Sequence, residues 1–132
     1  MTAIPEVFHD LLRSRAVAFI ATIGKNGAPQ VTPQWFLWDG QRLRISLVEG
    51  RQKLRNLRRD PRIAVAIADP DRPTSYLELR GRVSDLVPDP GFELERAIAE
   101  KYTGRWEDVE PPGTMRYATS VVVERITSQL GH

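Results

Sequence analysis

Turn-forming residues divide the chain into short apolar segments, and the spacing of these turns constrains the fold more than any other feature of the sequence. Residues 16–23 are apolar and lead into the Asn-Gly pair at 26–27, which is typical of β-hairpins. Residues 29–38 are therefore expected to return antiparallel to them. The Asp-Gly pair at 39–40 predicts the next tight turn. Residues 42–48 then alternate leucine or isoleucine with other side chains, as a strand with one buried face does.

The rest of the chain continues this pattern with helices inserted. Strands are predicted at residues 63–68, 76–87 and 117–126, and helices at residues 5–12, 52–59 and 90–102. The proline- and aspartate-rich residues 69–73 predict a loop, and Gly81 predicts a bend or bulge. About six strands with two or three helices predict a mainly β (α+β) fold, a closed or nearly closed antiparallel barrel, in one domain of residues 1–132.

Composition narrows the classes of function. The 132 residues suffice for a hydrophobic core, and the chain has no cysteine, which excludes disulfides and thiolate chemistry. No apolar run approaches the roughly 20 residues of a membrane span and no signal peptide is recognisable, so we expect a cytoplasmic protein without a membrane partner. With two histidines, neither a histidine metal site nor a serine-histidine-aspartate triad is expected. Such a chain is typical of proteins whose bound cofactor carries the chemistry.

Residues 46–59 run from an apolar strand through Gly50 into a basic helix. A helix start offers unpaired N–H groups and the positive end of the helix dipole, and both favour a bound anion. Arg51 and Lys53 add full charges there, and a net charge of +2 is enough to attract a small anion. These residues indicate a phosphate site, although a solvated basic turn accounts for the same local pattern.

The basic helix belongs to a wider pattern of motifs. The pattern consists of residues 21–23 (ATI), 27–36 (GAPQVTPQWF), 39–40 (DG), 50–62 (GRQKLRNLRRDPR) and 76–81 (YLELRG). In order and spacing these segments resemble the pyridoxamine 5'-phosphate oxidase-like split-barrel superfamily. More closely, they resemble its branch that uses the deazaflavin coenzyme F420. The resemblance covers residues 8–88 in register and the last strand more loosely.

The resemblance implies a fold, an assembly and a phosphate site. The fold is a six-stranded antiparallel split β-barrel with flanking helices, the FMN-binding split-barrel fold. The assembly is a homodimer with a cofactor site at each subunit interface. Arg51 and Lys53 match the family's phosphate-binding positions, and Asn56 lies beside them.

The resemblance also implies which residues contact the rest of the cofactor. Ser46 and Leu47 match positions that line it, residues 32–35 match the segment beside its tricyclic ring, and Tyr76 falls on a strand near the partner's site. The implied cofactor-binding residues are Thr32, Pro33, Gln34, Trp35, Ser46, Leu47, Arg51, Lys53, Asn56 and Tyr76.

The implied reaction is hydride transfer from reduced F420 to an activated double bond of a small organic substrate. No catalytic residue is assigned, because the sequence does not choose among solvent, Tyr76 and Tyr117 as the proton source. Residues 69–74 and 102–115 are expected to form loops that select the substrate. Residues 126–130 lack the tryptophan often found after the last strand in relatives, which leaves the contacts of the tail open.

Other interpretations of the same residues stay open. FMN can occupy a similar phosphate site, and a non-catalytic F420 carrier would keep the site without the reaction. A small barrel that binds single-stranded nucleic acid through its arginines, Trp35 and Trp106 is disfavoured by the low net charge. Trp35 can also fill the barrel or the dimer interface, and Thr32-Pro33 can mark an edge strand or a bulge.

Overall fold

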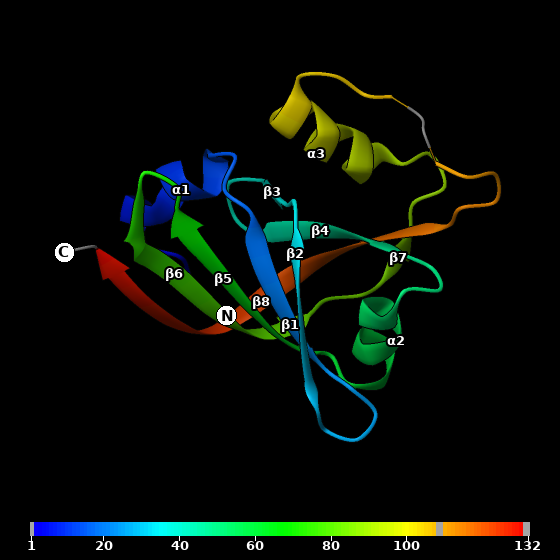
Figure 1. Ribbon diagram of the computed structural model, residues 1–132, viewed down its shortest axis with the longest axis horizontal. Helices are drawn as coiled ribbons and strands as arrows, with labels where there is room; N and C mark the ends of the chain where they lie inside the picture. Colours follow the sequence, from blue (N-terminus) through cyan, green and yellow to red (C-terminus); the bar gives the residue numbers. More distant parts are fainter. Residues whose placement is uncertain (1, 108–109, 131–132) are drawn as a thin grey trace.

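The computed structural model describes residues 2–107 and 110–130, which form an antiparallel β-sheet with helices around it (Figure 1). Hydrogen bonding links the strands in the order β2-β1-β5-β6-β8-β4-β3, and β7 pairs with β8 off this path. The strands are β1 (Ala18–Ile23), β2 (Pro29–Gln34), β3 (Leu37–Trp38), β4 (Leu43–Val48), β5 (Arg62–Asp69), β6 (Arg72–Val83), β7 (Val87–Pro88) and β8 (Arg116–Leu130). The helical elements are η1 (Glu6–Phe8), α1 (His9–Arg13), α2 (Gln52–Arg59) and α3 (Glu93–Thr103).

The long strand β8 joins the two halves of the sheet. Its first residues, 116–120, pair with β4, and residues 121–130 pair with β6. At the two ends of the path, β2 and β3 pair with β1 and β4, respectively. Among the described residues these two end strands are not paired with each other, so the barrel stays open between them. The predicted split barrel is confirmed, and full closure is not observed.

The predicted number of six strands is wrong for two reasons. The expected strand over residues 29–38 is interrupted after Gln34, because the backbone of Phe36 bonds to α3 instead of to a strand. The Phe36 N–H donates to the Tyr102 hydroxyl over 3.4 Å, and the Phe36 carbonyl accepts from Lys101 over 3.0 Å. Residues 37–38 then pair with β4 as the separate strand β3. The second reason is the two-residue strand β7, which pairs with the start of β8.

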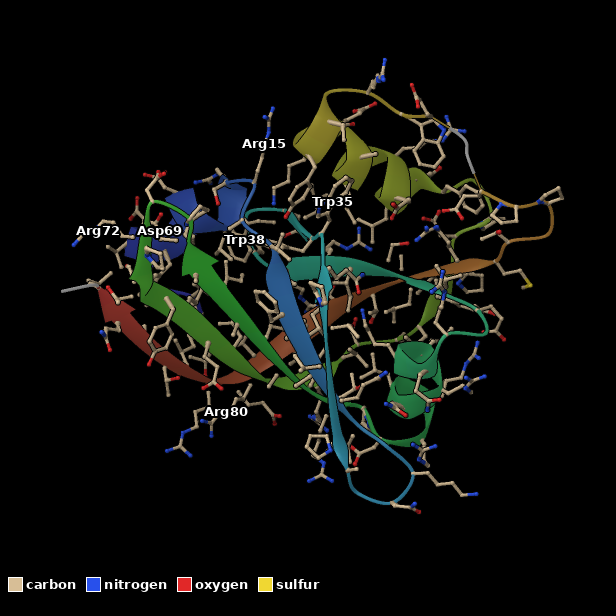
Figure 2. The ribbon with its side chains drawn as sticks, in the orientation of Figure 1. Arg15, Trp35, Trp38, Asp69, Arg72 and Arg80 are labelled. Carbon is tan, nitrogen blue, oxygen red and sulfur yellow. The ribbon has the colours of Figure 1, made fainter. Side chains whose placement is uncertain are left out.

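The predicted loop at residues 69–73 is also wrong. Strand β5 continues to Asp69 and β6 begins at Arg72, so Pro70 and Asp71 alone make the turn. The Asp69 carboxylate accepts from the Asp71 N–H over 2.9 Å, which closes the turn without a longer loop. Figure 2 shows Asp69 and Arg72 together at one end of the sheet, far from Trp35. In one chain, this hairpin tip therefore lies away from Trp35.

The bulge predicted at Gly81 is confirmed. The pairing of β6 with β8 shifts register between Arg80 and Gly81. A Cβ atom on Gly81 would lie 1.9 Å from the carbonyl oxygen of Val122, so the backbones approach too closely for a side chain. Inside the barrel, the buried core includes Phe36 and Leu12. No helix among the described residues is long and apolar enough to cross a membrane.

Candidate functional site

A cavity of about 590 Å³ lies where the barrel is open, between β2 and β4. The start of α2 closes one side, and α3 with the first residue of β8 closes the other. Figure 1 shows α2 and α3 at either side of the region where β2 passes β4. Eight of the ten residues predicted to bind a cofactor line this cavity, and they are Thr32, Pro33, Gln34, Trp35, Ser46, Leu47, Arg51 and Lys53.

The helix α2 has the bounds that the sequence predicted, residues 52–59. Leu54 and Leu57 are buried and hold it against the barrel. Arg51 precedes the first helical residue, and no described side chain caps the N–H groups of the first turn. Because these groups lack acceptors inside the helix, the helix start together with Arg51 and Lys53 forms a positively charged binding surface for an anion.

Lys53 reaches across the opening of the barrel to β2. Its ammonium donates to the side-chain oxygen of Gln34, and the Gln34 amide nitrogen donates to the Ser46 carbonyl over 2.7 Å. Gln34 thereby links α2, β2 and β4 at one point. Burial, and to a lesser extent the neighbouring charge of Arg51, together lower the pKa of Lys53 to about 8. An anion placed here would counter both effects.

The strand β2 presents a polar face to the cavity. Gln30, Thr32 and Gln34 alternate along it and all line the cavity, whereas Val31 between them is exposed on the other face. The Thr32 hydroxyl is buried and has no hydrogen-bond partner among the described residues. Three polar side chains in a row are not a core pattern, so this edge strand is suited to hold a polar, ring-shaped ligand.

Asn56 does not line this cavity. Its side chain is fully buried, and its amide nitrogen donates to the Thr22 hydroxyl over 3.0 Å and to Gln30 over 3.1 Å. Its amide oxygen accepts from Gln52 over 2.8 Å and from Arg59 over 3.1 Å. These four bonds occupy the whole amide group. Asn56 fixes α2 against β1 and β2.

Tyr76 also lies outside this cavity. It is 37% exposed on β6, where it pairs with Ala68 of β5 and Gln129 of β8. The structure of one chain therefore does not bring Tyr76 together with the other predicted residues. Any contact of Tyr76 with a bound cofactor would have to come from a second copy of the chain.

Two charged residues of the cavity were not predicted, Glu95 of α3 and Arg116 of β8. Arg116 donates to the Ser46 hydroxyl over 3.3 Å, pairs with Glu95 over 3.3 Å and donates from its Nε to Glu110 over 2.8 Å. Burial raises the pKa of the Glu95 carboxyl, and the charge of Arg116 opposes that shift. No local motif marks these residues, because they come from elements far apart in the sequence.

Trp35 lies at the boundary of the cavity, beneath α3 (Figure 2). Its ring stacks on Tyr102 with a centroid distance of 4.7 Å and an interplanar angle of 3°. The side chain remains 40% exposed, whereas Phe36 is fully buried and Trp38 is 9% exposed. Of the three aromatic residues in this segment, the two after Trp35 fill the core, and Trp35 is the one available to a ligand.

The residues present fit a molecule that joins a phosphate to a planar polar ring. The anion site at α2 and the polar face of β2 border one cavity, and the unpaired Thr32 hydroxyl offers a further hydrogen bond there. Such a split barrel, with its anion site at the opening, defines the class of flavin-type cofactor-binding proteins. Residues 4–130 match the family described as pyridoxamine 5'-phosphate oxidase. The chain belongs to the pyridoxamine 5'-phosphate oxidase family.

Solved structures of similar proteins support this assignment. One named F420 reductase is 37% identical, with a TM-score of 0.85 over 96% of this chain and 100% of that chain. A conserved hypothetical protein from Mycobacterium tuberculosis is 25% identical, with a TM-score of 0.76 over 95% of this chain and 84% of that chain. HupZ of Group A Streptococcus is 22% identical, with a TM-score of 0.68 over 95% of this chain and 93% of that chain, and shows the fold alone.

Proposed function

We propose that the protein is a coenzyme F420-dependent reductase that acts on an activated double bond of a small organic substrate. The observation that carries this proposal is that one continuous cavity extends from the basic start of α2 to Trp35. The proposal is supported by the similarity to a solved F420 reductase, which covers 96% of this chain. When bound, the reduced deazaflavin would supply the hydride, and the protein would need no nucleophile of its own.

Different residues of the cavity would bind different parts of the cofactor. Arg51, Lys53 and the first N–H groups of α2 would hold the phosphate, as charge-assisted hydrogen bonds hold such groups. The polar face of β2 and the strand segment Ser46-Leu47 would hold the ring from two sides. Fixing the ring in one orientation and limiting the access of water are the contributions that hydride transfer requires from a protein.

A homodimer completes the proposal, and the outward face of the sheet supports it. On that face Phe19 is 49% exposed and Val31 is 62% exposed. Phe19 pairs directly with Pro33, which itself lines the cavity, so the apolar face adjoins the candidate cofactor site. Tyr76 belongs to the same outward face through its pairing with Ala68. A second copy packed here would bring its Tyr76 towards the site, as the family resemblance implies.

The oligomeric state is tested by sedimentation velocity. We expect twice the mass of one chain for the native protein, and a shift towards one chain mass for Phe19→Glu, which places a charge in the contact. A native protein that sediments as a monomer at micromolar concentration would contradict the dimer, and with it the role of Tyr76.

The cofactor is tested by fluorescence titration of the cofactor-free protein with F420 and, in parallel, with FMN. Tight binding of F420 with weak binding of FMN supports the proposal, whereas the reverse preference favours the FMN-dependent alternative. The double variant Arg51→Ala, Lys53→Ala should lose about 3 kcal/mol of binding free energy, because two charge-assisted bonds to phosphate are lost. Arg72→Ala, at the remote hairpin tip, is the matched control. Unchanged affinity in the folded double variant would place the phosphate elsewhere.

Turnover separates a reductase from a carrier. Reduced F420 is mixed with the protein and a series of enones and quinones, and oxidation of the cofactor is followed by its absorbance. Oxidation that depends on both protein and acceptor supports the reductase. Tight F420 binding without any acceptor-dependent oxidation would support the non-catalytic carrier.

A further inference from the structure

Among the described residues that line the cavity between β2 and β4, one carries a carboxyl group, Glu95 of α3. Reduction of a double bond adds a hydride to one carbon and a proton to the other, so the proposed reaction needs an acid as well as a cofactor. Tyr76 and Tyr117 do not line the cavity. Lys53 can also release a proton near neutral pH, but it donates to Gln34 at the proposed phosphate site. Glu95 is therefore the candidate acid.

The helix α3 holds Glu95 at the cavity wall. Leu94 and Ile98 on either side of it are buried and fix the helix against the barrel. The Asp89 carboxylate accepts from the N–H groups of Glu93 and Leu94, each over 3.0 Å, and so fixes the start of the helix. The Glu95 side chain is 19% exposed, so it is largely removed from bulk water while it still borders the cavity.

Two carboxyl groups share the guanidinium of Arg116 unequally. Glu110 accepts from its Nε over 2.8 Å and also from its Nη2, so it occupies the fork of the guanidinium. Glu95 is reached by Nη1 over 3.3 Å, and the same nitrogen donates to the Ser46 hydroxyl over 3.3 Å. The charge of Glu95 is therefore compensated less well than that of Glu110, which favours a proton on Glu95.

The surroundings of Glu95 favour its protonated form on balance. Burial is the largest influence and raises the pKa of its carboxyl. The charge of Arg116 opposes this shift, as does a hydrogen bond with Ser46. The carboxylates of Glu110 and Asp89 add to it. The other charged residues of this region are Arg51 and Lys53 across the cavity, Glu93 and Arg96 of α3, and the ion pair of Arg105 with Glu107.

We propose that Glu95 is the proton donor of the reaction, and that Arg116 and Ser46 position its carboxyl group. The inference rests on the proposed F420-dependent function. With an enone, the hydride forms a C–H bond at the β-carbon and the π electrons of the double bond move towards the carbonyl, which gives an enolate. The O–H bond of Glu95 then breaks, and its proton forms a C–H bond at the α-carbon. Solvent returns a proton to the carboxylate and takes up the proton that the oxidised cofactor releases.

The first measurement needs no cofactor. The titration of the Glu95 carboxyl is followed by carbon NMR of the full chain labelled in its glutamate side chains, and Glu95→Gln identifies the signal. We expect a midpoint above the usual glutamate range. Glu110→Gln should lower this midpoint, because it removes a neighbouring carboxylate and frees the fork of Arg116. A midpoint within or below the usual range would overturn the inference.

The second measurement compares two acceptors at saturating F420. Cyclohexenone needs a hydride and a proton on carbon, whereas N-methylacridinium needs the hydride alone. Glu95→Gln keeps the shape of the side chain but has no acidic proton, so it should lower kcat about a hundredfold with cyclohexenone. With N-methylacridinium, kcat should change by less than about threefold. Glu93→Gln makes the same replacement on the exposed side of the same turn and should change neither rate.

Two kinetic results would overturn the inference. No loss with cyclohexenone would mean that Glu95 gives no proton to the substrate, and equal losses with the two acceptors would mean that it acts on binding or on hydride transfer. Failure of the proposed function gives a different result. The native protein would then bind no F420, or would bind it and reduce neither acceptor, and the role of Glu95 as proton donor would fall with the reductase.

Discussion

The protonation of Lys53 makes cofactor binding depend on pH in a way that the structure specifies. Burial and Arg51 hold the pKa of Lys53 at about 8 in the free protein. A phosphate bound beside Lys53 favours the protonated ammonium, so its pKa rises on binding and a proton is taken up. With a pKa of about 8, roughly nine-tenths of the free protein carries that proton at pH 7 and roughly one-tenth at pH 9. Affinity should therefore fall about tenfold from pH 7 to pH 9.

Calorimetry in buffers of different ionisation enthalpy measures this proton uptake directly. At pH 8 we expect about half a proton to be taken up per F420 bound, since half of Lys53 is then neutral. Lys53→Arg keeps the positive charge but does not titrate in this range, so it should bind with a flat pH profile. The difference between native protein and this variant removes any protonation of F420 itself.

Two results would refute this reasoning. If native protein and Lys53→Arg take up the same number of protons at pH 8, Lys53 is not the titrating group. If affinity rises with pH, the bound phosphate does not lie beside the ammonium, and the assignment of the anion site to the start of α2 fails with it.

Three further predictions concern stability and are measured by urea unfolding. Asn56→Ala should lower the free energy of unfolding by about 2–3 kcal/mol, because it removes a hydrogen bond to the buried Thr22 hydroxyl on β1 and one to the half-buried Gln30 side chain on β2. Gly81→Ala should cost about 3 kcal/mol, since its Cβ would meet a β8 carbonyl at 1.9 Å, whereas Gly91→Ala, with its nearest atom at 3.8 Å, should change stability by under ~0.5 kcal/mol. Glu49→Ala should cost under ~1 kcal/mol, because its 2.7 Å pair with Arg58 is solvent-exposed.

Much of the fold could be predicted because its signals are local. Gly50 and Pro61 delimit α2, and the leucines between them give its buried face, so its bounds were predicted correctly. The Asn-Gly pair predicted the β1–β2 hairpin for the same reason. The interruption after Gln34 could not be predicted, because the groups that bind the Phe36 backbone belong to α3, more than sixty residues later in the chain.

In the candidate site, too, the residues that local signals mark could be predicted. Arg51 and Lys53 could be found from the helix start alone, and the family resemblance supplied residues 32–35 and 46–47, which line the same cavity. The hydrogen bonds of Asn56 could not be predicted, because helical spacing shows which face a residue shares but not what the neighbouring strand presents to it. Here β1 presents a hydroxyl, and the amide is occupied by it.

The strand β8 has a consequence for how the molecule opens. Since its first five residues pair with β4 and the remainder with β6, neither half of the sheet can separate without breaking bonds to the same strand. Opening should therefore be cooperative, and the backbone amides of β4, β6 and β8 should exchange with deuterium at one common, slow rate. The edge strand β2, bonded on one side only, should exchange faster and on its own, so the polar wall of the candidate cofactor cavity can open locally while the rest of the barrel stays closed.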